Sequence, residues 1–172
     1  MTISIARRKD DVRAAVMKLS DIVGDDHRIE HHFSPEDPRF ADLIETTWRE
    51  LLDADLLELR GRSLALTSFG WITGLRLSGR LQSAEVRLRA QAVVKALKAR
   101  VKGRHGLHDE LVDVRELAQE LHLPVGWLWN AMDADLLQKV FPKDRMNARL
   151  DQQHKTLVKV PPTFGSDPID IE

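Results

Sequence analysis

The sequence contains no cysteine and no tyrosine among its 172 residues. The absence of cysteine excludes disulfides, thiolate zinc sites, iron–sulfur clusters and cysteine nucleophiles. Small secreted domains usually need disulfides, so the composition favours an intracellular protein, and we expect a cytoplasmic one. No apolar run of membrane-spanning length is present, and the N-terminal segment lacks the apolar core of a signal peptide. We therefore expect no membrane association.

Signatures of catalysis are also scarce. The sequence has no Walker loop, no G-x-S-x-G motif and no dinucleotide-binding fingerprint. Residues 27–31 match H-x-x-E-H formally. A zinc protease needs that motif on a helix together with a further carboxylate ligand, and here Gly24 and Pro35 leave room only for a short helix. We therefore expect a protein that is not an enzyme and needs no cofactor.

The histidines around this motif have two interpretations, one of which involves a bound metal ion. A structural or adventitious metal ion is one interpretation of the cluster Asp25, His27, His31 and His32. The alternative is a surface histidine cluster that responds to pH. No metal is part of the function that we predict.

Charge is unevenly distributed, although the formal net charge is only −1. Hydrophobic residues make up 42% of the chain and charged residues 31%, as in a folded globular protein. Residues 20–60 contain twelve acidic and four basic residues, whereas residues 76–104 contain nine basic residues against Glu85 alone. Such asymmetry can mark an anion-binding face. The alternative is that acidic and basic faces neutralise each other within one protein or across an oligomer.

Apolar periodicity predicts a mainly α-helical fold with small β-hairpins, in the α+β class. The expected helices cover residues 5–23, 39–52, 69–77, 83–102, 113–121 and 125–135. Two strand-like runs flank residues 60–63 and predict a hairpin, and residues 136–141 and 155–160 predict two further strands. Residues 28–33 fit a short strand or an irregular connector. The last segment, residues 161–172, combines prolines with carboxylates and predicts a flexible acidic tail.

A five-residue segment occurs twice in the chain. D-A-D-L-L at 53–57 recurs at 133–137, each time after a helical pattern that contains tryptophan. Each copy precedes a basic-tipped segment that ends in Phe-Gly. The shared context predicts a duplicated unit, with one copy over about 1–80 and the other over about 81–160.

A helix, a helix-turn-helix and then a β-hairpin resemble the winged-helix branch of the helix-turn-helix superfamily. The first copy carries the resemblance in L-L-D-A-D-L-L-E-L at 51–59 and L-A-L-T-S-F-G at 64–70. The chain departs from the family at Asp55 and Asp135, where winged helices more often carry glycine, and in the turn at 122–124, which also lacks it. The resemblance implies two winged-helix units joined by a long basic helix. In DNA-binding members the second helix of the motif enters the major groove and the wing contacts phosphate.

The basic residues favour contact with a nucleic-acid backbone rather than with bases. Five positions fall on one stripe of the 83–102 helix: Arg87, Gln91, Lys95, Lys98 and Lys102. Further cations are Arg104, which follows this helix, and the residues of the two expected wings, Arg60, Arg62, Lys143, Arg145, Arg149 and Lys155. On the second helix-turn-helix, only Asn130 suits base recognition. We therefore predict phosphate contacts to DNA with weak direct base readout.

A protein-interaction module is the competing interpretation. Tandem winged helices also serve as adaptor subunits, for example in chromosome-condensation complexes, and acidic recognition helices favour that role here. Trp48 and Trp129 lie on apolar helical faces and are expected in the core. Trp127 lies off that face and is expected to be exposed at an interface, whereas Trp71 is expected to pack where the two units join. The resemblance is also compatible with a homodimer, although no residue pattern indicates its surface.

Overall fold

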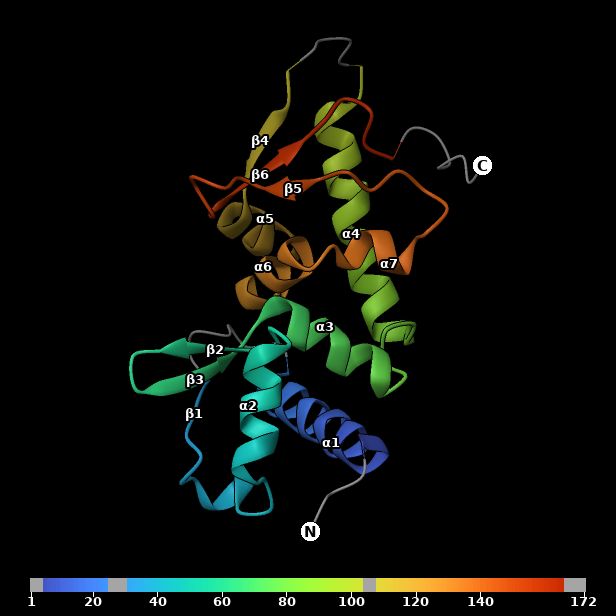
Figure 1. The fold of residues 1–172 in the computed structure, drawn as a ribbon. Coiled ribbons are helices and arrows are strands. Elements are labelled where there is room, and N and C mark those ends of the chain that lie inside the picture. Colours follow the sequence, from blue (N-terminus) through green and yellow to red (C-terminus); the bar gives the residue numbers. More distant parts are fainter. Residues whose placement is uncertain (1–4, 25–30, 104–107, 166–172) are drawn as a thin grey trace. The chain divides into compact units, whose positions relative to one another are not determined.

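The computed structural model describes residues 5–24, 31–103 and 108–165 (Figure 1). The chain divides into two units, Met1–Arg80 and Leu81–Glu172. The described residues form seven α-helices and two three-stranded antiparallel sheets, so the expected α+β class is confirmed. None of the helices in these ranges has the length and apolarity needed to cross a membrane.

Unit 1 combines three α-helices with one small sheet. Its elements are, in chain order, α1 (Ile5–Val23), β1 (His32–Phe33), the 3-10 helix η2 (Pro38–Phe40), α2 (Glu45–Asp53), β2 (Leu57–Arg60), β3 (Ser63–Leu66) and α3 (Ser68–Leu77). The strand order is β1-β3-β2, with Phe33 opposite Leu64 and Leu57 opposite Leu66. The predicted first helix, the hairpin and the helix that follows it are therefore confirmed.

The core of unit 1 forms because α1 repeats apolar residues at helical spacing. The residues that this spacing buries are Ala15, Val16, Leu19 and Val23. Phe40 lies edge-on to both Phe33 and Trp48, with ring centroids 5.5 and 5.6 Å apart. Edge-to-face contacts of this kind are favourable beyond the area they bury. Trp48 is 4% exposed, so its predicted place in the core is confirmed.

Helices α1 and α3 approach closely at a glycine. A Cβ atom at Gly74 would collide with the Ser20 side chain and would lie 3.1 Å from the Val16 carbonyl oxygen. Two hydrogen bonds fix the same contact. The Ser20 hydroxyl donates to the Trp71 carbonyl at 3.1 Å, and the Trp71 indole N–H donates to the Gly24 carbonyl at 2.9 Å. Only glycine permits this approach, so position 74 determines how tightly unit 1 packs.

Unit 2 begins with the longest helix of its part of the chain. Its elements are α4 (Ala84–Val101), β4 (Glu110–Asp113), α5 (Val114–Leu121), α6 (Val125–Asp133), α7 (Leu136–Val140), β5 (Arg149–Leu150) and β6 (Leu157–Val160). The strand order is β4-β6-β5, so the central strand is the last in sequence, as it is in unit 1. One side of this sheet is buried by Val112 and Val158, which lie directly opposite each other.

Two N-caps in unit 2 lie at the residues where the sequence predicts helices to begin. The Ser83 hydroxyl accepts from the Val86 N–H at 3.3 Å and begins α4. The Asp113 carboxylate accepts from the N–H groups of Arg115 and Glu116, at 2.7 and 3.4 Å, and begins α5. Each side-chain oxygen satisfies amides that have no partner inside the first turn of a helix.

The strand predicted over residues 136–141 is wrong, because this segment forms the short helix α7. Leu136, Leu137 and Val140 are all buried, a spacing that a single helical turn brings to one side. At the matching place in unit 1, residues 57–60 form the strand β2 instead. The two D-A-D-L-L copies therefore share a turn and diverge after it.

The tail is shorter than predicted. Residues 161–165 are part of unit 2, since Phe164 is 2% exposed and its N–H donates to the Pro161 carbonyl at 3.0 Å. The Gly165 N–H donates to the Arg145 carbonyl at 2.6 Å. The remainder of the predicted tail, residues 166–172, lies outside the described residues.

Within the described ranges, three residues other than glycine adopt left-handed backbone conformations, each near a helix end. The φ angle is +57° at Asp55, +52° at Asp135 and +54° at His122. Glycine is the residue that usually accepts this conformation, and aspartate tolerates it better than most others. The His122 N–H closes α5 by donating to the carbonyls of Ala118 and Gln119. The turns that lack glycine in the sequence therefore keep the backbone geometry that glycine favours. In this geometry the Cβ atom lies close to the following carbonyl oxygen.

Replacing Gly74 with alanine should force α1 and α3 apart. We expect the Gly74→Ala variant to lower the free energy of unfolding by about 1–3 kcal/mol, the usual cost of overpacking. Urea denaturation measures this decrease, and amide hydrogen exchange in α1 assigns it to unit 1. The matched control is Arg76→Ala on the exposed side of the same helix. Equal stability of the two variants would contradict the close approach.

Replacing His122 with glycine should stabilise the protein. The His122→Gly variant removes the Cβ atom that disfavours a positive φ, so we expect a gain of up to about 1 kcal/mol in unfolding free energy. The His122→Ala variant keeps a Cβ and serves as the control. If thermal denaturation ranks the glycine variant no higher than the alanine variant, the left-handed conformation at this position is disproved.

Candidate nucleic-acid interface

Helix α4 has an apolar face and a basic face. Its buried residues are Val86, Ala90, Val93, Val94, Ala96, Leu97 and Val101. Gln91, Lys95, Lys98 and Lys102 are exposed on the stripe that the sequence predicts. The helix therefore fixes the ammonium groups of Lys95 and Lys98 on one side, because the apolar face can only lie against the core. Lys102 follows as the C-cap residue, where the backbone is already extended.

The cations of α4 differ in how they are partnered. Arg89 pairs with Glu85 at 3.1 Å, and Arg100 pairs with Glu120. The Arg87 guanidinium donates to the Gln82 side-chain oxygen at 2.6 Å and lies 5.5 Å from the Phe141 ring centroid. By contrast, none of the described residues pairs with the exposed lysines, Lys95, Lys98 and Lys102.

A connection between α7 and β5 lies beside this stripe. The Gln138 side chain holds it at two points, donating to the Asp144 carbonyl at 3.0 Å and accepting from the Met146 N–H at 3.2 Å. Lys143 is exposed in this connection and Arg145 is partly exposed, and no described acidic side chain pairs with either. We call Lys95, Lys98, Lys102, Lys143 and Arg145 the basic surface.

The backbone near Gly165 also lies against the stripe. A Cβ atom at Gly165 would collide with the aliphatic stem of Lys98, so this stem packs directly on the backbone there. The stem of a lysine can lie on apolar or backbone surface while its ammonium group remains in water. Lys98 is therefore held in place along its length, although its charge is unpaired within the described part of the chain.

The wing of unit 2 carries a second group of cations. Arg149 on β5 lies directly opposite Lys159 on β6, a like-charge pair that is unfavourable unless an anion offsets it. Lys155 is exposed in the turn between these strands. Figure 1 shows this turn and α7 on opposite sides of unit 2, so the predicted residues of unit 2 form two groups rather than one.

The Asp151 carboxylate offsets part of the positive charge of this wing. It accepts from the Gln153 N–H at 3.0 Å, and it lies 3.9 Å from the Lys159 ammonium and 3.6 Å from the His154 ring. The Gln153 hydrogen bond and, to a smaller extent, the Lys159 charge hold the pKa of the Asp151 carboxyl below its usual range.

The wing of unit 1 contributes less charge than predicted. Arg60 donates to the Glu58 carboxylate at 2.8 Å, two residues away on the same strand, so its charge is largely offset. Arg62 is exposed at the turn, next to Gly61, whose φ of +63° suits the tight connection. Arg104 and His27 lie outside the described residues.

Neither candidate recognition helix presents a base reader. In α6, residues 126–132 are all buried, and Asn130 is 1% exposed. Its predicted availability to bases is therefore wrong for this structure. In α2 the exposed side includes Glu45 and Asp53, and Arg49 is paired with Glu45 at 3.1 Å. An acidic helix repels phosphate, so sequence readout through α2 is unfavourable.

The predicted interface tryptophans are buried. Trp127 is 1% exposed and lies beneath the Arg89 guanidinium, 5.8 Å from ring centroid to Cζ, so the expectation that it is exposed is wrong. Trp71 is 2% exposed and is held by its hydrogen bond within unit 1. The position of Trp127 off the apolar stripe does not predict exposure, because residues 126–132 of α6 are buried on every side of the helix.

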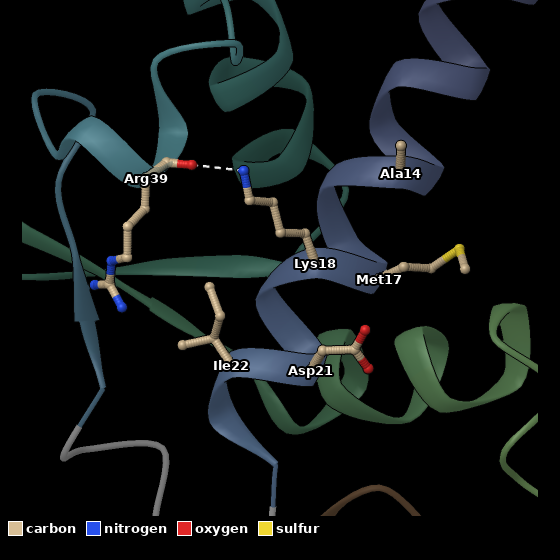
Figure 2. A pocket seen from close by; sticks show the side chains of 6 residues that line it. All are labelled: Ala14, Met17, Lys18, Asp21, Ile22 and Arg39. Carbon is tan, nitrogen blue, oxygen red and sulfur yellow. Dashed lines mark hydrogen bonds between the residues drawn. The ribbon is translucent and has the colours of Figure 1, made fainter.

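Unit 1 contains an apolar groove of about 770 Å³ along α1 (Figure 2). Ala14, Met17 and Ile22 supply its apolar lining. Figure 2 shows Lys18 extending toward Arg39, whose carbonyl accepts its hydrogen bond. No sequence pattern indicates this groove, because the residues that line it fall outside the buried stripe of α1.

The charges at the rim of the groove are neutralised within unit 1. Asp21 pairs with Arg80 at 2.8 Å, and Arg39 pairs with Asp37 at 2.8 Å. The hydrogen bonds from Arg39 hold the pKa of the Asp37 carboxyl below its usual range. Such a groove can bury an apolar surface without leaving a new charge unpaired.

Comparisons with known proteins and the search for metal sites give no further assignment. A comparison of the chain with protein-family models, curated proteins and solved structures found no significant match. Among residues 5–24, 31–103 and 108–165, no three potential metal ligands come together, although His31 and His32 are included there.

The Asp151 carboxyl provides a test of the wing. Its folded pKa is depressed, so its contribution to stability is present above the unfolded value of about 3.9 and disappears as the pH falls through the folded value. We expect a carbon-13 NMR titration to give a pKa below that unfolded value. The Lys159→Gln variant should raise the pKa only in part, because the Gln153 hydrogen bond remains. A complete return of the pKa to the unfolded value in this variant would contradict the larger effect assigned to the Gln153 hydrogen bond.

Proposed function

We propose that this chain is a non-catalytic DNA-binding protein, with a regulatory or accessory role in a DNA transaction. The observation that carries the proposal is the basic surface of unit 2. Its cations are exposed or, at Arg145, partly exposed, and they have no acidic partner among the described residues, while neighbouring arginines on α4 are paired with glutamates. Unpaired cations held on a rigid helix are suited to bind an extended polyanion.

The order of elements supports a winged-helix assignment for both units. Each unit runs from a long helix through a short strand and two helical segments to a hairpin, and the first strand pairs with the last. This is the succession that the winged-helix resemblance implies. Unit 2 differs by the inserted helix α7. The chain would then reach DNA through α4 and a wing rather than through the second helix of its motif.

The spacing of the lysines matches a phosphate backbone. Lys95 and Lys98 lie one helical turn apart on α4, and Lys102 is the C-cap residue just after it, so at a rise of 1.5 Å per residue about 10 Å separates the first from the last. Successive phosphates advance by about 3.4 Å along each strand of a duplex, so these lysines can follow about three of them. Because α2 and α6 offer no exposed base reader, binding depends weakly on sequence.

A protein-interaction adaptor is the second candidate function, and the groove of unit 1 favours it. The groove combines an apolar lining with rim charges that are already paired, which suits the apolar face of an amphipathic helix from a partner protein. Met17 lines the groove and is partly exposed. A Met17→Glu variant would block such a helix and should leave DNA binding unchanged, so it separates the two candidates.

The decisive experiment is a fluorescence anisotropy titration of labelled duplex DNA at several salt concentrations. We expect the triple variant Lys95→Glu, Lys98→Glu and Lys102→Glu to weaken binding by about tenfold or more at low salt. The slope of log K against log salt should become shallower by about 0.9 for each phosphate that the variant no longer neutralises. Arg87 is left unchanged, because it packs on Phe141 and its removal would disturb the fold.

The control for this experiment changes the same net charge elsewhere. Its substitutions replace exposed arginines outside the basic surface: Arg13→Glu, Arg76→Glu and Arg115→Glu. Binding should survive in the control, and circular dichroism should show both variants folded. Absence of binding by the unmodified chain at low salt would refute the proposal, as would equally weakened binding in the two variants.

A further inference from the structure

A pocket of about 370 Å³ opens within the basic surface of unit 2. Its apolar lining comes from Val94 on α4 and from Phe141 and Met146 in the connection after α7. Lys95 and Lys98 line the same pocket. An apolar lining with a few convergent polar groups is typical of a small-ligand site, and this volume lies in the range of such sites.

The polar groups of the pocket are of two kinds. Lys95 and Lys98 provide positive charge, whereas Asp144 provides a carboxylate and Gln91 an amide. No described ion pair joins Asp144 to either lysine. A ligand that satisfies all of them needs an anionic end for the lysines, an apolar planar body, and hydrogen-bond donors for the carboxylate.

The wall that carries Asp144 is built to be rigid. The Gln138 side chain bonds the connection at the Asp144 carbonyl and at the Met146 N–H, and the Asp144 N–H donates to the Phe141 carbonyl at 3.2 Å. The Arg87 guanidinium covers part of the Phe141 ring and is itself held by Gln82. The ring is therefore ordered before any ligand arrives, which lowers the entropic cost of binding.

The geometry points to a nucleotide pocket, in which Lys95 and Lys98 take the phosphate, Phe141 and Met146 contact the face of the base, and Asp144 accepts from its exocyclic amino group. This inference rests on the proposed function, since the same lysines contact the DNA backbone. It adds that unit 2 takes an unstacked base out of the duplex or from a single strand. A paired base cannot enter, because its face is covered by its neighbours in the stack.

The carboxylate of Asp144 also gives the pocket a preference among bases. It can only accept hydrogen bonds, so the exocyclic amino group of adenine, cytosine or guanine is favoured. Thymine carries a carbonyl oxygen at the corresponding place and is repelled. An asparagine at position 144 offers both a donor and an acceptor, so it should remove this discrimination.

The test compares duplexes that differ at one extrahelical position, using the full chain and fluorescence anisotropy. The probes carry an extrahelical adenosine, an extrahelical thymidine, an abasic residue or no extra residue. We expect the adenosine probe to bind about tenfold more tightly than the abasic one, in line with one base contacting an aromatic ring. Phe141→Leu should reduce this ratio to about one and leave binding to the paired duplex unchanged.

A second pair of variants tests the base preference. Asp144→Asn should equalise the adenosine and thymidine probes, whereas the control Asp109→Asn, on an exposed carboxylate outside the pocket, should not. Free deoxyadenosine monophosphate, followed through the amide signals of Gln91 and Met146, distinguishes a free nucleotide from one within a strand. Its binding in the absence of any DNA binding would keep the pocket and refute the proposed function.

The remaining outcomes are also distinct. Salt-dependent binding to the paired duplex, with equal affinity for the adenosine and abasic probes, would refute the pocket and keep the proposed function. Absence of binding to every probe and to the free nucleotide would refute both. Equal discrimination by the unmodified chain and the Phe141→Leu variant would likewise overturn the assignment of the base to this pocket.

Discussion

Unit 2 depends on the burial of one face of α4. A unit of this size has a thin core, so its longest helix must supply a large share of the apolar surface. Ala90, Val93 and Leu97 are each 0% exposed, and they fix the rotation of the helix about its axis. That rotation places Lys95 and Lys98 beside the connection after α7, so the position of the charges follows from the position of the core. Electrostatics alone would not bring like charges together.

Most helices and the first hairpin follow from local patterns in the sequence. Apolar spacing gives α1 and α4, and the Ser83 and Asp113 caps identify two helix starts, because these signals depend only on residues a few positions apart. The α7 helix was missed because five residues give too short a period to separate helix from strand. Strand β5 has only two residues, too few to show an alternation of apolar and polar residues. Strand β4 begins and ends with a carboxylate, so its apolar residues do not form a recognisable strand pattern.

The site was predictable only in part. The stripe on α4 depends on helical spacing alone and is recovered, whereas the pairing of Arg60 with Glu58 and the enclosure of α6 depend on tertiary packing. Trp127 shows why local patterns are insufficient. Its position off the apolar stripe would indicate exposure only if that side of the helix faced solvent, and residues 126–132 of α6 are all buried. The pocket brings together residues about 50 positions apart, from Gln91 to Met146, and no local pattern records that.

The facing cations Arg149 and Lys159 make ionic strength act on this protein in two opposite directions. Added salt screens their repulsion and so tightens the hairpin, yet the same ions compete for every ammonium group that would meet a phosphate. Under the proposed function, a preparation kept at high ionic strength for the sake of solubility would therefore be well folded but would not bind DNA. Dilution would restore the proposed DNA binding and loosen the wing at the same time. A bound oligoanion would reduce the repulsion between these cations at the place where it binds. A rise of the melting temperature with short polyphosphates would therefore show that the anion binds at these cations.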